Sequence, residues 1–382
     1  WVRSAGLRRQ WPQRLEIGWR RHWPATWVFA GVAGWILLQG ASWTTRSWHH
    51  PLWAEAAMAL GTPLPGAISL SPRDGITALM RLMSYGGIFW LAMHLGRAPE
   101  RARRMLWSLV ISASLYAAYG LLVQLSGSDR LLWFEKWAYE DSLTATFVNR
   151  NSFATYAGLA IVAATGLLLR RLRQIEPASA SSGDIAAVID RLTTAVGLPA
   201  VCLVVLTAAL LLSHSRGGLF ASLCGLAALL AIDLLRRDRR RRTRRTAAVV
   251  LVGFAVVMLI GGGITLQRLD QEGREDLATR GWIHAQAAKA IPETPLTGTG
   301  YGSFASVFAG LRDENYIRLA HIDMAHNTYL ELAVELGLPA SLILIAIPAW
   351  ITYRCWRGQA ERHRDALYPA VAVVASVLVG VH

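Results

Sequence analysis

Apolar and polar stretches alternate along this chain in blocks of about twenty residues. A helix that crosses the hydrocarbon core of a bilayer needs a block of about that length, because it rises about 1.5 Å per residue through about 30 Å. We therefore expect an all-α, polytopic membrane protein with about nine membrane-spanning helices, in a chain that stops within the ninth. The predicted spans are residues 24–42, 76–95, 105–126, 152–169, 196–213, 217–235, 246–265, 327–350 and 367–382.

The basic residues alternate between the two sides of these predicted spans. Alternate connecting segments hold 26 of the 39 Lys and Arg residues, and these segments are 1–22, 96–104, 170–195, 236–245 and 354–364. Cytoplasmic loops of membrane proteins are enriched in Lys and Arg, so the pattern predicts a cytoplasmic amino terminus. The segments 43–75, 127–151, 214–216 and 266–326 would then face outward.

Composition agrees with a membrane protein. The chain is 53% hydrophobic, has a positive mean hydropathy and contains sixteen Trp. A net charge of +14 in a soluble protein would suggest nucleic acid as a partner. Here the Arg residues stand beside apolar blocks, where topology and anionic lipids explain them. We expect membrane lipids as partners and no nucleic acid.

The longest polar segment, 266–326, divides the chain into a membrane domain (1–265), an outward loop and the last spans (327–382). Long loops between spans are usually functional or disordered, and the Trp, Tyr and Phe residues of this one argue for an ordered loop. This one contains a predicted helix at 275–291 and the pattern Gly298-x-Gly300-x-Gly302. No strand precedes those glycines, so they predict a turn rather than a phosphate-binding loop.

Two arginines in the outward-facing segments are candidate anion ligands. Arg216, in Ser215-Arg216-Gly217-Gly218, stands where two spans meet almost without a loop, so it lies at a helix amino terminus that favours anions. The glycines there would let a ligand approach the backbone. Arg280 lies on the predicted loop helix. A tight turn with an interfacial Arg, and a solvated loop Arg, are the structural alternatives.

His326 directly precedes the eighth predicted span, with Asn327 placed to cap that helix. An imidazole titrates near about 6.5, so it can accept a proton at neutral pH. An interfacial His that only donates or accepts a hydrogen bond is the alternative. Glu331 and Glu335 follow on the same helical face, and a charge in a membrane span needs a cavity or a basic partner such as Arg81. We interpret this acidic pair as structural.

Residues at the start of the fourth predicted span are also polar. Asn149 and Arg150 could line a cavity, although capping by Asn151 or Ser152 explains much of this sequence. The outer loops contain no Asp-x-Asp or Glu-x-Asp pair, and no Cys and His residues have the spacing of metal ligands. We therefore expect a site without metal or cofactor.

These motifs together resemble the bacterial O-antigen ligase and polymerase family. The resemblance is strongest over residues 205–340. It rests on Ser215-Arg216-Gly217-Gly218, Arg280-x-Trp282, Gly298-x-Gly300-x-Gly302-x-Phe304, and Ala325-His326-Asn327-x-Tyr329-Leu330-Glu331-x-x-x-Glu335-x-Gly337, with Phe147-Val148-Asn149-Arg150-Asn151 as a further match.

The resemblance implies a lipid-linked glycosyltransferase of the GT-C type in the bacterial inner membrane, with many membrane helices, a large periplasmic loop and a periplasmic active site. Such an enzyme moves a glycan from undecaprenyl pyrophosphate to a lipid or glycan acceptor without metal. By motif, Arg216 and Arg280 would bind the pyrophosphate and His326 would be the base. Family members usually have more than nine helices, so we expect further helices beyond this chain. The remaining candidates, which could line the cavity, are Arg150, Asn149, Asn327, Glu331 and Arg81.

Several functions remain open at this point. Ligase, repeat-unit polymerase and protein O-oligosaccharyltransferase share a donor and differ in acceptor. A transporter of a lipid-linked or anionic substrate is a different class, since Arg and Glu in membrane spans fit it as well. A structural protein of the envelope is a third class.

Overall fold

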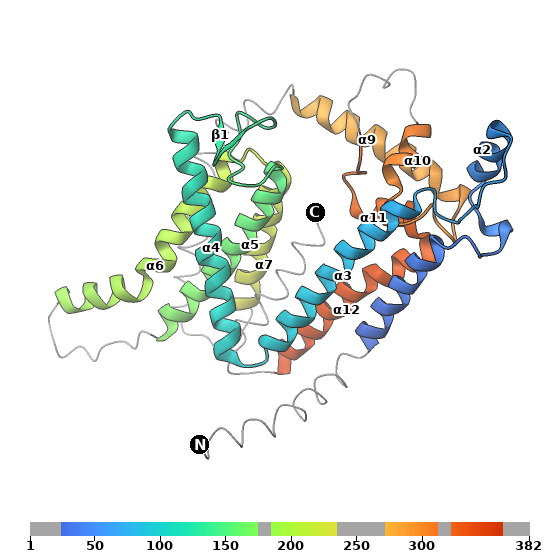
Figure 1. Cartoon of the computed structure of the whole chain (residues 1–382). Helices are drawn as coiled ribbons and strands as arrows, with labels where there is room; N and C mark the ends of the chain where they lie inside the picture. The colour runs from blue at the N-terminus through green and yellow to red at the C-terminus, as the bar shows by residue number, and fades with distance from the viewer. Residues whose placement is uncertain (1–23, 175–184, 235–271, 312–321, 362–382) are drawn as a thin grey trace, which may run out of the picture. The chain divides into compact units, whose positions relative to one another are not determined.

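The computed structural model describes residues 24–174, 185–234, 272–311 and 322–361, which are mostly α-helical (Figure 1). The predicted spans 246–265 and 367–382 lie outside these ranges. The chain divides into two compact units. Unit 1 consists of Trp1–Arg97 and Gly273–Ala349, and unit 2 of Ala98–Glu272 and Trp350–His382.

Unit 2 is a helical bundle built around α5. Small side chains along α5, such as Ala157, Ala160 and Ala164, are fully buried against the neighbouring helices. Small residues let helix backbones approach closely, which is the usual way of packing helices in membranes. The loop before α5 contains a short antiparallel pair, β1 (Arg130–Leu131) with β2 (Phe134–Glu135). The helices are α4 (Pro99–Leu125), α5 (Arg150–Gln174), α6 (Ile185–Leu212) and α7 (Arg216–Leu234).

Unit 1 combines long apolar helices with short polar elements. The helix Pro24–Gln39, α3 (Pro72–Leu95) and α12 (Leu338–Glu361) share a cluster that contains Val32, Leu82 and Leu344. The outward segments form the shorter elements, which are η1 (Arg46–Trp48), α2 (Leu52–Leu60), α9 (Glu272–Ala290), η2 (Ile291–Glu293), α10 (Phe304–Gly310) and α11 (Thr328–Leu336).

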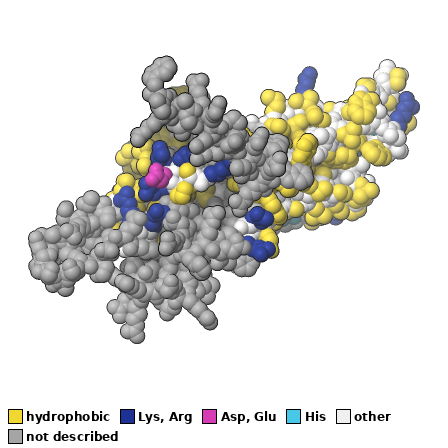
Figure 2. Space-filling view, turned by 90° about the horizontal axis from the view of Figure 1, so that it is seen from below, with side chains coloured by type: hydrophobic (Ala, Val, Ile, Leu, Met, Phe, Trp, Pro, Cys, Tyr) yellow, Lys and Arg dark blue, Asp and Glu magenta, His cyan; other side chains and the backbone are white. Residues whose placement is uncertain are grey.

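Three described helices are long and apolar enough to cross a membrane, namely Pro72–Leu95, Pro99–Leu125 and Arg150–Leu172. Shorter apolar helices occupy Pro24–Gln39, Val196–Leu212, Arg216–Leu230 and Leu338–Arg354. Large apolar side chains such as Met80 and Ile88 on α3 are about two-thirds exposed. Hydrophobic side chains cover much of the described surface in Figure 2. Such a surface fits lipid, so the chain is a membrane protein. The count of nine spans stays a prediction.

The eighth predicted span, 327–350, is wrong as a continuous helix. The structure has α11 up to Leu336 and α12 from Leu338, with Gly337 between them at φ 77°. A left-handed residue cannot continue a right-handed helix, and Gly adopts that conformation without strain. The amide of Leu338 donates to the carbonyl of Pro295 instead (2.8 Å), so a loop segment takes the place of the missing helical turn.

The glycine turn is confirmed. Gly298, Gly300 and Gly302 all have positive φ, at 67°, 104° and 82°. The turn runs directly against the end of α11, where Gly300 N donates to Glu335 O (2.9 Å). A Cβ on Gly298 would collide with the backbone at Glu335 and Gly337. We call this contact between residues 295–302 and 334–338 the glycine junction.

Candidate functional site

The two candidate arginines of unit 2 each begin a helix. Arg150 is the first residue of α5 and Arg216 the first of α7. The two helix starts are joined by a hydrogen bond from Ser215 Oγ to Asn151 Oδ1 (2.7 Å). Helix amino termini expose unpaired N–H groups and carry partial positive charge, which two guanidinium groups reinforce. This end of unit 2 is therefore electrically suited to an anion.

Arg150 is held by the loop that precedes α5. Its guanidinium lies over the ring of Tyr139, 5.1 Å from the ring centre, and Nη1 is 3.4 Å from Ser142 Oγ. The Nε atom is buried without a hydrogen-bond partner among the described residues. Stacking on an aromatic face fixes the plane of the guanidinium. Arg216, in contrast, is exposed.

Capping at this site differs from the sequence-based interpretation. Asn149 is the residue whose side chain accepts from a helix-start amide, that of Asn151, at 2.7 Å. Asn151 uses its own side chain to bind Ser215. Asn149 therefore shapes the start of α5 and leaves Asn151 for the link to α7.

Gly218 contacts a helix rather than being open to a ligand. It is buried, and a Cβ there would collide with the Cβ of Ala154 on α5. The sequence suggested that this glycine opens the backbone to a substrate. In the structure its role is to let α7 and α5 pack closely.

The candidate residues of unit 1 are gathered by a second apolar cluster. Ile283 and Ala287 of α9 pack with Phe304, Phe308 and Val334. Ala325, directly before His326, is fully buried in the same cluster. The helix that carries Arg280 and the segment that carries His326 are thus parts of one packed body. This face of α9 packs on α10 and α11.

His326 lies at a backbone position that residues with a side chain rarely adopt. Its φ is 51°, and its side chain is exposed. The residues on both sides are fixed, since Ala325 N donates to Glu331 Oε2 (2.9 Å) and Asn327 Oδ1 accepts from the amides of Tyr329 and Leu330. The predicted cap at Asn327 is confirmed. His214, two residues before Arg216, also has a positive φ of 52°. Left-handed residues other than Gly gather at functional sites.

Glu331 and Glu335 bind backbone amides rather than a basic side chain. Glu335 is buried and accepts from Phe304 N (2.9 Å), at the start of α10. The described residues contain no ion pair between either acid and Arg81, which is exposed on α3. The structural role of these acids stays a prediction, and Arg81 affects the Glu335 carboxyl through its charge rather than through a close salt bridge. Backbone amides replace it, because a carboxylate at a helix start satisfies otherwise unpaired N–H groups.

Sequence reasoning missed two residues. Gln39 is fully buried, and its Nε2 donates to Thr297 O (2.7 Å) and Glu335 O (2.8 Å) while Oε1 accepts from Tyr301 N (3.2 Å). Tyr301 is half-buried, and burial raises the pKa of its hydroxyl to about 12. A Gln at the end of an apolar span was the only signal for Gln39.

The described residues contain no group of three or more His, Cys, Asp or Glu side chains that could hold a metal ion. In unit 2, Arg150 and Arg216 lie at two helix starts that a hydrogen bond between Ser215 and Asn151 joins. Unit 1 brings the elements of Arg280 and His326 into one cluster. Chemically, unit 2 can bind an anion, and unit 1 offers a cation with an exposed imidazole that can take up a proton.

Comparison with known families gives one match, and no curated protein matches the chain. Residues 201–345 match the O-antigen ligase family. The matched region contains Arg216, Arg280, His326 and the glycine junction, and it agrees with the resemblance seen in the motifs. A domain of this family supports a glycosyltransferase-like function of the ligase or polymerase type in surface polysaccharide synthesis. The chain thus contains a region, residues 201–345, that is similar to the O-antigen ligase family.

Proposed function

We propose that the protein transfers a glycan from undecaprenyl pyrophosphate to an acceptor hydroxyl at the periplasmic face of the bacterial inner membrane. The observation that carries the proposal is the O-antigen ligase match over residues 201–345, since it contains both arginines and the histidine. The joined helix starts of α5 and α7 support it, because a pyrophosphate needs concentrated positive charge.

In the proposed reaction the acceptor oxygen bonds to the anomeric carbon of the glycan as the bond from that carbon to the pyrophosphate oxygen breaks. The imidazole of His326 takes the hydroxyl proton, and the leaving group departs as the undecaprenyl pyrophosphate anion. A positioned base contributes about 10²–10⁴-fold to such a step. Arg216 and Arg280 bind the developing negative charge, for which the paired N–H groups of a guanidinium are well shaped.

Alanine substitution of these residues tests the proposal. We expect His326→Ala, Arg216→Ala and Arg280→Ala each to lower the rate of glycan transfer by about 10²–10⁴-fold, at unchanged protein level in the membrane. His94→Ala and Arg103→Ala change the same residue types elsewhere, on α3 and α4, and should keep full activity. The readout is transfer from a purified lipid-linked donor. Full activity in His326→Ala would remove this residue as the base.

Metal independence is a separate expectation. If only the arginines stabilise the leaving group, transfer should continue at an unchanged rate after EDTA treatment and gel filtration into metal-free buffer. Restoration of a lost rate by added Mg²⁺ or Mn²⁺ would contradict this mechanism. Arg216→Ala, assayed with and without divalent ions, shows whether a metal can replace the missing cation.

A transporter of a lipid-linked or anionic substrate is a second candidate. The break between α11 and α12 at Gly337 favours it, because discontinuous helices are common at transporter sites. An assay in detergent separates the two functions, since a transporter forms no new glycosidic bond. Surface polysaccharide from a deletion strain then separates the acceptors. Loss of attachment with intact polymer indicates a ligase, and attachment of single repeats indicates a polymerase.

A further inference from the structure

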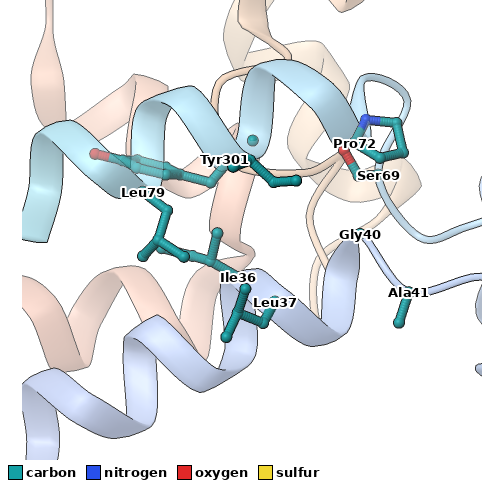
Figure 3. A pocket seen from close by; sticks show the side chains of 10 residues that line it. Ile36, Leu37, Gly40, Ala41, Ser69, Pro72, Leu79 and Tyr301 are labelled. Atoms are coloured by element: carbon teal, nitrogen blue, oxygen red, sulfur yellow. The ribbon is translucent and has the colours of Figure 1, made fainter.

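Unit 1 contains an apolar cavity of about 120 Å³ between the helix Pro24–Gln39 and α3 (Figure 3). Ile36 and Leu37 line it from the first helix, Pro72, Ile76 and Leu79 line it from α3, and Tyr301 closes it from the glycine junction. Apolar cavities of about 150 Å³ in other proteins remain dry and bind hydrocarbons such as benzene. At about 120 Å³ this cavity is somewhat smaller, so it would hold a hydrocarbon segment of only a few carbons.

Two glycines line the cavity. Gly75 allows close packing, because a Cβ there would be 3.1 Å from the carbonyl oxygen of Tyr301, whereas Gly40 has no contact that close. A Cβ on Gly40 would be 3.8 Å from Pro72 Cβ, an ordinary contact, and the φ of Gly40 is not positive. Neither backbone conformation nor close packing requires glycine at position 40, so the open space itself is what Gly40 provides.

The cavity is open to the side of the helices that faces lipid. Leu37 is 59% exposed and Ile76 is 58% exposed, although both line the cavity. Both helices are apolar, and α3 is long enough to cross a bilayer. A hydrocarbon chain in the membrane can therefore enter without crossing a polar surface.

The cavity is also continuous with the elements that carry the candidate site residues. Tyr301 lies in the turn that leads to Phe304, and Phe304 packs in the cluster with α9 and Ala325. The amide of Tyr301 donates to Gln39 at the end of the first helix. A chain in the cavity would have its polar end at the level of the outward loop that holds Arg280 and His326.

We propose that this cavity binds a segment of the polyprenyl chain of the lipid-linked glycan donor. This rests on the proposed function and adds the residues that hold the apolar part of the substrate. A general membrane phospholipid could fill an apolar groove at any place on α3. Tyr301, which closes this cavity, lies within the O-antigen ligase region, and we therefore assign the cavity to the donor lipid.

The test measures binding of undecaprenyl phosphate, which has the chain but no glycan. The full chain in phospholipid nanodiscs is titrated with this lipid and analysed by native mass spectrometry. We expect Gly40→Leu, which fills the cavity, to weaken binding at least tenfold. Gly34→Leu is the matched control on the same helix. Gly34 is exposed, and a Cβ there would have no atom within 4 Å, so this variant should change the affinity for undecaprenyl phosphate less than twofold.

A second variant keeps the binding test decisive if Gly40→Leu does not fold. Ile76→Trp adds bulk at the mouth of the cavity, where the exposed side chain can be enlarged without burial, and should also weaken binding about tenfold. Wild-type affinity in folded Gly40→Leu and Ile76→Trp overturns the proposal. So does a phospholipid that fills the cavity and is not displaced by undecaprenyl phosphate.

Transfer assays on the same preparations separate the two proposals. If wild-type protein binds undecaprenyl phosphate with the expected dependence on Gly40 but forms no glycosidic bond, the transfer function fails and the chain site stands. If the Gly40→Leu protein transfers and binds as the wild type does, the chain site fails and the transfer function stands.

Discussion

At the scale of single residues, the carboxyl of Glu335 is the most constrained group near the candidate site. It lies in α11, a nine-residue helix too short to cross a membrane. Burial raises its pKa to about 7, and Glu331 contributes in the same direction, while the amides of Gly302 and Phe304 and the charge of Arg81 oppose both. The acid that orders the glycine junction therefore titrates near neutral pH.

This pKa predicts how stability depends on pH. A carboxyl whose pKa is higher in the folded than in the unfolded protein favours folding while it is protonated. Its contribution is complete below about pH 4.5 and is lost as the pH rises through about 7. We expect the purified protein to melt a few degrees lower at pH 8 than at pH 5.5. Glu335→Gln should reduce that difference, and an unchanged difference would assign it to other groups.

At the scale of elements, the packing of α5 against α7 determines where Arg150 and Arg216 lie. The two helices touch through Gly218 and Ala154, and Gly158 lies against Ser222 in the same way. Interiors packed this closely resist even one added carbon. The separation of the two helix starts, and so of their positive ends, depends on these small residues.

A substitution at Gly218 tests this dependence. Gly218→Ala should force α5 and α7 apart, destabilise the protein by about 1–3 kcal/mol and lower glycan transfer. Gly87→Ala is the control, because Gly87 is exposed on α3 and an added Cβ there meets no atom within 4 Å, and it should leave glycan transfer unchanged. Thermal unfolding and initial transfer rates are the measurements. Equal behaviour of the two variants would show that the contact does not position the arginines.

At the scale of the whole molecule, the sequence predicts which segments face outward, and the alternation of Arg-rich segments is the basis for that topology. Two exposed positions in unit 1 and at the start of α4 make it measurable. Glu293 lies in η2, within the predicted outward loop, and Glu100 lies in the first turn of α4, within the predicted cytoplasmic segment 96–104.

Cysteine labelling of intact cells checks this topology. In a background with Cys202, Cys224 and Cys355 replaced by Ala, Glu293→Cys should react with a membrane-impermeant maleimide reagent. Glu100→Cys should react only after the inner membrane is opened. The reverse result would place His326 on the cytoplasmic side, where a periplasmic transfer reaction is impossible.

Local features of the structure were predictable from sequence. The cap at Asn327 and the turn at Gly298–Gly302 follow from residue types that satisfy helix-start amides or adopt positive φ. The break at Gly337 had a signal in Gly337-Leu338-Pro339, which apolar periodicity outweighed. The role of Gln39 had almost no signal in the sequence. Its hydrogen-bond partners lie 258 to 296 residues away, and no local sequence pattern indicates such distant contacts.

That distance in sequence has a consequence for biogenesis. The helix Pro24–Gln39 leaves the ribosome early, but the carbonyls that Trp35 and Gln39 bind belong to Leu336 and Glu335. At a synthesis rate of about 5–20 residues per second, these carbonyls are made about 15–60 s after the first helix. Residues 98–272, a continuous stretch of unit 2, are made in the interval. Ribosome-stalled chains that end before residue 335 should therefore show helices α4 to α7 packed together while the first helix is still accessible to insertion factors and proteases.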